Sequence, residues 1–330
     1  MTKHTPIQPS GDAKLAKTGS LLERAESAFG LNTLGPPAVP KDLPDPGPRP
    51  LQTTSGNPQP AAREQAETSV AGTPEGAVAE VSSARVPLCG PAYEVDREAL
   101  RDSGLIVPED PVTGLLEEFR IIKRELLADA RASHAIKARR ILISSPLPGE
   151  GKTFCAANLA IALSAERDVE VLLVDADVNN PSISQLFGIE DAPGFMDALV
   201  DPGQRPEELA IATDIERLFI MPAGTSSARD SELLASARTG QVLDRLTQGA
   251  PNRLVIFDTP PALAASPAAE LAAFVGQALL VVRADETGRA AIDDAQQLLS
   301  ACADLKLLLN AAQFSPSGRR FGDYGSRESV

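Results

Sequence analysis

The sequence predicts an α/β fold with a mostly parallel sheet and helices on both of its faces. Six apolar runs have the length of strands, and each is continuously apolar rather than alternating, as expected for strands that are covered on both sides. Stretches with the apolar spacing of helices separate these runs, and such βαβ alternation is typical of parallel sheets. The predicted strands occupy residues 139–145, 169–175, 217–223, 253–258, 278–284 and 305–310.

The residues before this core have a different composition. Residues 19–30, GSLLERAESAFG, place their apolar side chains on one side of a short helix, which is either a docking segment or a transient helix within an N-terminal tail of residues 1–30. Twelve of the 28 prolines, and none of the phenylalanines, lie between residues 31 and 91. We therefore predict a disordered, proline-rich linker over residues 31–92, because this composition does not support a packed core.

The globular part begins with an amphipathic helix. In residues 110–130, DPVTGLLEEFRIIKRELLADA, apolar side chains recur at helical spacing. The charged residues on the more exposed side are Glu117, Arg120, Lys123 and Arg124. We place the folded domain at residues 93–314 and a polar, flexible tail at residues 315–330.

Composition excludes several classes of function. The formal net charge of −14 argues against a nucleic acid as the main partner. Three widely spaced cysteines and two histidines do not form a zinc-binding pattern. The N-terminus lacks the apolar core of a signal peptide, and the longest nearly apolar stretch, LAAFVGQALLVV, is too short to span a bilayer. We therefore expect a cytoplasmic protein that reaches a membrane only through a partner.

The segment SSPLPGEGKTFCAANLA, residues 144–160, has the context of a phosphate-binding loop. An apolar strand ends here, a short loop with proline and glycine follows, and a helix is predicted from residue 153 to 165. Gly149 and Gly151 let backbone amides approach a polyphosphate, Lys152 would reach the β- and γ-phosphates, and the Thr153 hydroxyl would bind Mg²⁺. The standard pattern has glycine at position 146, where this chain has Pro146. The alternative is a chance GKT on a surface turn.

Three aspartates follow strands of the predicted sheet. Asp175 and Asp177 lie at the end of one strand, and Asp258 lies at the end of another. In parallel sheets ligands bind at the carboxyl ends of the strands, so these groups should meet near the phosphate loop. Three carboxylates would repel a triphosphate unless Mg²⁺ lay between them. A single strand-end aspartate can instead cap a helix or turn a loop.

Three motifs carry a family resemblance. SSPLPGEGKT, VLLVDADVNNPS and LVIFDTPP resemble the Walker A, A′ and B motifs of the bacterial tyrosine kinases, which are P-loop NTPases of the MinD/ParA-like type. The signature lysine of the MinD/ParA loop, five positions before the P-loop lysine, is replaced here by Leu147. The resemblance covers roughly residues 115–310. LLERAESAFG and MPAGTSSARDSELLAS further resemble the cytoplasmic tyrosine autokinases of exosortase-associated exopolysaccharide clusters.

The resemblance implies ATP and Mg²⁺ as cofactors and assigns roles to the residues of the three motifs. Lys152, Asp175 and Asp177 would be catalytic, with one of the two aspartates taking a proton from a tyrosine hydroxyl. The nucleotide would contact Pro148, Gly149, Glu150, Gly151, Lys152, Thr153 and Phe154, with Asn310 near the adenine. The metal ligands would be Thr153, Asp175, Asp177 and Asp258, the last through a bound water.

The resemblance also implies an acceptor and an assembly. Relatives generally end in a tyrosine cluster, whereas this chain has two tyrosines, Tyr93 and Tyr324, of which only Tyr324 lies in the tail. Glu117, Arg120 and Lys123 have the spacing of the family's E-x-x-R-x-x-R subunit contact, with lysine in the third place.

These features predict an autokinase that regulates exopolysaccharide polymerisation and export. It would be a homo-oligomer at the inner membrane, and a chain-length-determinant protein would activate it. A tyrosine phosphatase would remove the phosphate that it adds. The alternatives are an ATP-binding assembly switch that transfers no phosphate, in which Tyr324 serves only tail solubility, and a MinD/ParA-like ATPase.

Overall fold

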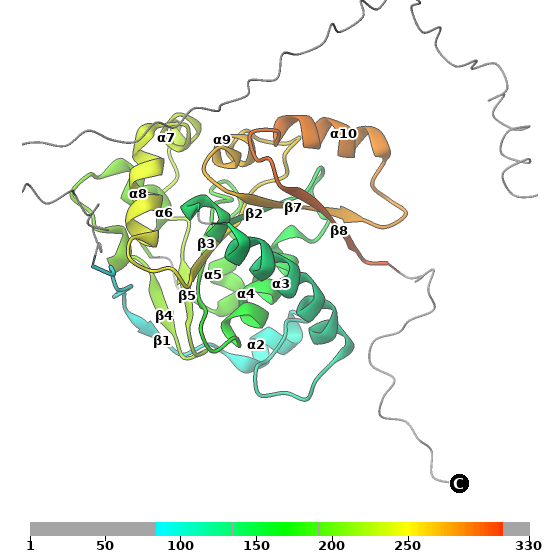
Figure 1. Cartoon of the computed structure of the whole chain (residues 1–330), viewed down its shortest axis with the longest axis horizontal. Coiled ribbons are helices and arrows are strands. Elements are labelled where there is room, and N and C mark those ends of the chain that lie inside the picture. Colours follow the sequence, from blue (N-terminus) through cyan, green and yellow to red (C-terminus); the bar gives the residue numbers. More distant parts are fainter. Residues whose placement is uncertain (1–83, 134, 190–191, 313–330) are drawn as a thin grey trace, which may run out of the picture. The chain divides into compact units, whose positions relative to one another are not determined.

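The structure, a computed structural model, describes residues 84–133, 135–189 and 192–312, which form an α/β unit (Figure 1). The N-terminal tail, most of the predicted linker and Tyr324 lie outside the described residues. The packed region extends further back than the predicted domain start at residue 93. Val86 and Leu88, which fall in the predicted linker, are buried, and the Arg253 guanidinium donates a hydrogen bond to the Val86 carbonyl oxygen (2.9 Å).

The unit is built on a sheet of eight strands in the order β1-β4-β5-β3-β6-β2-β7-β8. The strands are β1 Ala92–Tyr93, β2 Arg140–Ser144, β3 Glu170–Asp175, β4 Ile211–Thr213, β5 Leu218–Met221, β6 Arg253–Asp258, β7 Gln277–Arg283 and β8 Leu305–Asn310. Strands β4 and β5 pair antiparallel, and the other pairs are parallel. All six predicted strands are confirmed to within two residues at each end, and the predicted fold class is confirmed with them.

Helices cover both faces of this sheet, as predicted. They are α2 Arg97–Asp102, α3 Gly114–Ala132, α4 Lys152–Ser164, α5 Ile183–Phe187, α6 Phe195–Val200, α7 Asp230–Leu234, α8 Ala237–Thr247, α9 Pro267–Ala272 and α10 Arg289–Leu298, with 3₁₀ turns η2 Ile136–Arg139 and η3 Pro206–Glu208. Every helix among these is too short or too polar to cross a bilayer.

Alternate residues of each central strand enter different apolar cores, because successive side chains of a strand point to opposite faces. Ile141 and Ile143 of β2 join a core with Phe119 of α3 and Leu159 of α4. Leu142, between them, joins a second core. That core includes Phe195 of α6, Leu243 of α8 and Leu271 of α9. The continuous apolar character of the strands is thus explained by burial on both sides.

Helix α3 differs from the sequence prediction at one charged position. Lys123 was expected on the exposed side, but it is buried, and its ammonium donates a hydrogen bond to the Ala162 carbonyl oxygen (2.9 Å) and pairs with Glu166 (2.8 Å). The hydrogen bond from Lys123 lowers the pKa of Glu166. The carbonyl groups in the last turn of a helix lack partners and carry partial negative charge, so a lysine is stabilised there. The aliphatic stem of Lys123 meanwhile fills the contact between α3 and α4.

Replacing Lys123 with methionine should lower the free energy of unfolding by about 1–2 kcal/mol, because the Ala162 carbonyl loses its charged donor. The matched control is Arg124→Met on the adjacent, exposed residue, which should change stability by no more than about 0.5 kcal/mol. Urea unfolding at neutral pH measures both values. Equal effects of the two substitutions, or a change in subunit assembly with stability unaltered, would contradict this assignment.

Candidate functional site

The loop between β2 and α4 has the backbone of a phosphate-binding loop. β2 ends at Ser144 and α4 begins at Lys152. Positive φ in the loop is confined to Gly149 (80°) and Gly151 (92°), the left-handed conformation that glycine adopts without strain. The residue at position 146 does not have a positive φ, so proline fits the backbone there.

Helix α4 presents its amino end to this loop. Gly151 is the N-cap residue, and no side chain caps the helix there. The first N–H groups of a helix have no partner within it and carry partial positive charge, so they form a natural site for a phosphate group. Residues 155–164 of α4 are all buried, which holds the helix end in a fixed direction toward the loop.

Lys152 lies between two of the predicted aspartates. Its ammonium donates a hydrogen bond to Asp177 Oδ2 (2.8 Å) and lies 3.8 Å from Asp258 Oδ1. It also contacts the Thr153 hydroxyl (3.2 Å). The structure therefore brings together Lys152, Thr153, Asp177 and Asp258 from three separate motifs. An ammonium in this position compensates part of the cost of burying two carboxylates side by side.

Asp175 stands at the carboxyl end of β3, as predicted, and its oxygens accept hydrogen bonds from the backbone. Its Oδ1 accepts the Asp177 backbone N–H (3.1 Å), and its Oδ2 accepts those of Ser182 (2.9 Å) and Ile183 (3.0 Å). Burial raises the pKa of this carboxyl to about 6, against the lowering effect of the backbone hydrogen bonds. Asp175 thus shapes the connection between β3 and α5 and presents its oxygens to the backbone. The backbone N–H groups occupy part of the acceptor capacity of this carboxylate, and its ligating or proton-accepting role stays a prediction.

Asp258 is the least compensated group of the site. Its side chain is fully buried at the end of β6, and neither carboxylate oxygen has a hydrogen-bond partner. Burial raises its pKa to about 7. Buried polar groups are normally paired, so an orphaned carboxylate beside a phosphate loop indicates that a cation is part of the complete site.

A cleft of about 510 Å³ opens over these groups. Its lining residues are Pro148, Gly149, Gly151, Lys152, Thr153, Phe154, Asp177, Asn179, Asn180, Pro260, Pro261, Ala264 and Ala265. The sequence analysis missed the two asparagines, although they stand within the VLLVDADVNNPS motif that it singled out. Their amides add uncharged donors and acceptors at the mouth of the cleft.

Two residues predicted to contact the nucleotide have side chains that contact the loop itself, and their contact with the nucleotide stays a prediction. The Glu150 carboxylate is buried and accepts the Leu147 backbone N–H (2.7 Å). The Asn310 side-chain amide donates to the Glu150 carbonyl oxygen (2.9 Å). Phe154 lines the cleft and packs on the core below α3, as a residue near the nucleotide can do.

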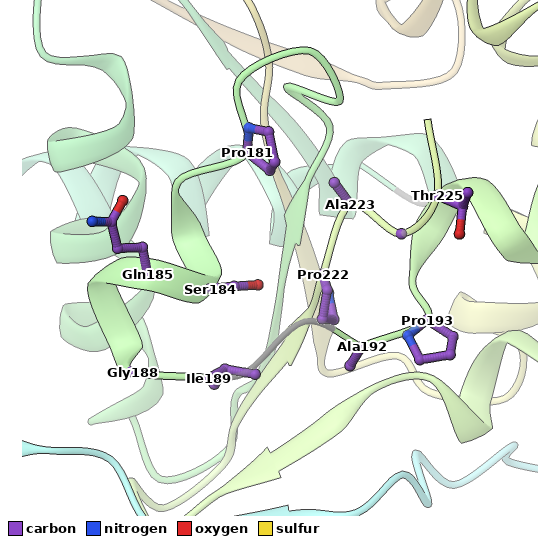
Figure 2. Close-up of a pocket in the computed structure, with 11 residues that line it drawn as sticks. Pro181, Ser184, Gln185, Gly188, Ile189, Ala192, Pro193, Pro222, Ala223 and Thr225 are labelled. Atoms are coloured by element: carbon purple, nitrogen blue, oxygen red, sulfur yellow. The ribbon is translucent and has the colours of Figure 1, made fainter. Parts of the chain in front are cut away.

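A larger cavity of about 1180 Å³ lies beside the connection between β3 and α5 (Figure 2). It is lined by Ser184 and Gln185 of α5, by Pro222 after β5, and by neighbouring residues up to Thr225. No lysine, arginine, aspartate or glutamate is among the described residues that line it. The smaller cleft is the better nucleotide site, because it brings Lys152 and Asp177 together at the phosphate loop.

A family model described as ParA, NUBPL iron-transfer P-loop NTPase, matches residues 137–305, a little over half of the chain. The match spans the strand β2, the phosphate loop and the ends of β3 and β6. The chain belongs to this ParA family of P-loop NTPases.

Several relatives similar to this chain are named as bacterial tyrosine kinases. A putative tyrosine-protein kinase EpsB from Ralstonia solanacearum is 34% identical over 224 residues, covering 67% of this chain and 28% of EpsB. The chain therefore spans little more than a quarter of that relative. Tyrosine-protein kinase YwqD from Bacillus subtilis is 27% identical over 72% of this chain and 98% of its own length.

A solved structure, the BceF tyrosine kinase domain, is 27% identical with a TM-score of 0.51, covering 67% of this chain and 92% of that domain. The predicted resemblance to the bacterial tyrosine kinases is confirmed by these relatives. The narrower resemblance to the exosortase-associated group is not confirmed.

The residues of this P-loop NTPase fit a magnesium ion bound together with the phosphates. In residues 84–133, 135–189 and 192–312, no three His, Cys, Asp or Glu side chains are arranged to hold a metal ion, so the predicted convergence of three carboxylates on one ion is not observed. Mg²⁺ however retains several waters and needs only one or two carboxylates besides substrate phosphates. Asp258, with both oxygens unpartnered, and the Thr153 hydroxyl would supply those protein ligands.

Asp258 should make the metal-free protein less stable as the pH rises. Its folded-state pKa of about 7 lies above the unfolded value of about 4, so its contribution to stability is full below pH 4 and is lost as the pH rises through 7. Asp258→Asn should therefore have a higher free energy of unfolding than the parent. This difference should be larger at pH 8 than at pH 5, by on the order of 2 kcal/mol. Urea unfolding in the presence of EDTA tests this.

The matched control is Asp168→Asn, because Asp168 is exposed. Its stability relative to the parent should be the same at both pH values. A gain for Asp258→Asn that does not depend on pH would show that the Asp258 carboxyl is already ionised in the folded chain at pH 5, and would contradict its raised pKa.

Proposed function

We propose that this chain is an ATP- and Mg²⁺-dependent protein-tyrosine kinase that phosphorylates tyrosine in trans, with Tyr324 of a second copy as an acceptor. The observation that carries the proposal is the meeting of Lys152, Asp177 and Asp258 at the amino end of α4. The kinase names of its relatives and the strand-end position of the three motifs support the reaction class.

Nucleotide binding would begin with the phosphate loop. The backbone amides at the start of α4 and the Lys152 ammonium are the positive groups that a triphosphate meets in the cleft. To reach the β- and γ-phosphates, Lys152 would exchange its hydrogen bond with Asp177 for phosphate oxygens. That exchange leaves Asp177 free at the moment when the donor is in place.

Mg²⁺, when bound, would neutralise charge on the β- and γ-phosphate oxygens during transfer. Asp258 and Thr153 are the residues that would hold it. The α4 amides and Lys152 are fixed before the reaction, so they stabilise charge in the transition state without reorganisation.

Asp177 is the better placed of the two candidate bases. It lines the cleft, whereas the Asp175 oxygens are occupied by backbone N–H groups. The tyrosine oxygen would attack the γ-phosphorus while its proton passes to an Asp177 carboxylate oxygen. The bond between the γ-phosphorus and the bridging oxygen breaks, and ADP leaves with that oxygen.

The biological setting follows from the resemblance to tyrosine kinases of exopolysaccharide systems. We place the kinase on the cytoplasmic side of the inner membrane, bound to a chain-length-determinant protein that activates it, with a tyrosine phosphatase reversing the modification. Phosphorylation of the tail would add about −1.5 to −2 charge close to Arg319 and Arg320 and so change the contacts of a homo-oligomer.

Intact-mass analysis after incubation with Mg-ATP tests the transfer. Purified chain, with the cytoplasmic segment of a chain-length-determinant protein, should gain phosphate that peptide mapping places on Tyr324. Lys152→Met should lower the rate by at least about 10²-fold, because the charge that stabilises the transition state is removed. Tyr324→Phe should abolish most incorporation. The matched control is Tyr93→Phe, since the Tyr93 hydroxyl is hydrogen-bonded to the Gly188 carbonyl oxygen within the fold.

Phosphate incorporation that survives in Lys152→Met would overturn the kinase proposal. If Mg-ATP drives assembly with no phosphotyrosine in any variant, the chain is instead a nucleotide switch. The single tyrosine in the tail is the feature that favours this second function. Hydrolysis stimulated by DNA or by lipid would point to a MinD/ParA-like ATPase.

Subunit contact through α3 is part of the proposal. Glu117 and Arg120 pair with each other one turn apart and are each about one-third exposed, whereas Lys123 is engaged inside its own subunit. The first two positions of the motif would therefore carry the contact.

Arg120→Glu should shift the oligomer toward monomer in light scattering, because it places two carboxylates together. Arg131→Glu, on an exposed residue of the same helix, should leave the assembly unchanged.

A further inference from the structure

The outer side of the phosphate loop is tied to the neighbouring strands β7 and β8. The Arg283 guanidinium at the end of β7 donates to the Gly149 carbonyl oxygen (3.4 Å). The Asn310 amide at the end of β8 donates to the Glu150 carbonyl oxygen (2.9 Å). In a trans peptide the N–H of the next residue points opposite to the carbonyl. These two bonds therefore fix the directions of the Glu150 and Gly151 N–H groups, which point away from β7 and β8.

The Glu150 side chain adds one bond within the loop and one bond to the connection between β7 and α10. Its residue is 4% exposed, and the Oε2 oxygen accepts the Leu147 N–H (2.7 Å) across the loop. Its Oε1 oxygen is hydrogen-bonded to the Thr287 hydroxyl in the connection between β7 and α10. A buried carboxylate requires such partners, so the two bonds hold the loop closed and hold it against the β7–α10 connection.

Thr287 is itself held firmly. Its hydroxyl oxygen accepts the Arg283 backbone N–H (2.8 Å), and its own N–H bonds to the Arg283 carbonyl oxygen (3.0 Å). Because the ionised Glu150 carboxylate can only accept, the Thr287 hydroxyl donates its hydrogen to Glu150 while its oxygen accepts the Arg283 N–H. Thr287 is absent from the lining of the nucleotide cleft. It can act on a bound nucleotide only through the loop.

Close packing around Gly151 completes the arrangement. A Cβ atom at this position would lie 2.2 Å from Asn310 Nδ2, so only glycine lets the asparagine amide approach the loop. The β7–α10 connection and the end of β8 are thus built against the side of the loop that faces away from the phosphates.

We propose that Glu150 and Thr287 are a positioning pair that pre-orients the loop amides for the nucleotide phosphates. The β7–α10 connection thereby sets the affinity for di- and triphosphates. The pair acts at the nucleotide site of the proposed function and so rests on it, but it requires nucleotide binding and not phosphoryl transfer.

Titration with Mg-ADP by calorimetry tests the pair, using the full chain and two variants. Thr287→Val keeps the shape of the side chain but removes the hydroxyl, and the dissociation constant should rise about 5- to 20-fold. Thr287→Ser restores the hydroxyl and should bind within about 2-fold of the parent. An unchanged dissociation constant in Thr287→Val, or equal weakening in both variants, would overturn the proposal.

Kinetics separate positioning from a loss of folded protein. Losing amide contacts that are made equally in the bound and transition states raises KM and leaves kcat nearly unchanged. Thr287→Val should therefore raise the KM for ATP in step with the dissociation constant, with kcat within about 3-fold of the parent. A fall in kcat at constant KM would indicate a merely structural role and would overturn the proposal. If the parent binds Mg-ADP but transfers no phosphate, the kinase proposal fails. The titration still shows whether Glu150 and Thr287 position the loop.

Discussion

The buried negative charge at the carboxyl ends of β3 and β6 is the constraint on which the rest of the site depends. Two carboxylates, Asp177 and Asp258, lie within reach of one ammonium, Lys152, and Asp258 has no hydrogen bond of its own. A triphosphate that draws Lys152 toward itself leaves both carboxylates uncompensated unless a cation arrives with it. This shortage of positive charge would couple the binding of a nucleotide to that of a metal ion.

The phosphate loop shows why a departure from a sequence pattern need not be a defect. The pattern's first glycine is replaced by Pro146, yet the left-handed backbone conformations occur only at Gly149 and Gly151 within this loop. The loop is closed instead by a side chain, since Glu150 accepts the Leu147 N–H. A carboxylate and two glycines thus meet the conformational demands of the turn.

Most of the fold and the donor side of the site could be predicted because their signals are local. Continuous apolar runs identified the six long strands, and the strand ends located Asp175, Asp177 and Asp258. β1 and β4 were missed because strands of two and three residues show no periodicity. The different roles of Asp175 and Asp258 depend on which backbone N–H groups face them. Asp175 accepts N–H groups from residues 177, 182 and 183, whereas Asp258 accepts none, and no sequence spacing reveals this difference.

The end of β8 is joined to the phosphate loop by a side-chain amide. Asn310 donates to the Glu150 carbonyl oxygen, and its own Oδ1 accepts the Ala311 N–H (2.9 Å), so both ends of its amide are engaged. Ala311 has a positive φ of 54°, an uncommon conformation for alanine that turns the chain away from the sheet. The turn thus follows directly on the residue that holds the phosphate loop. A displacement of Asn310 would release the Glu150 carbonyl oxygen and with it the direction of the Gly151 N–H.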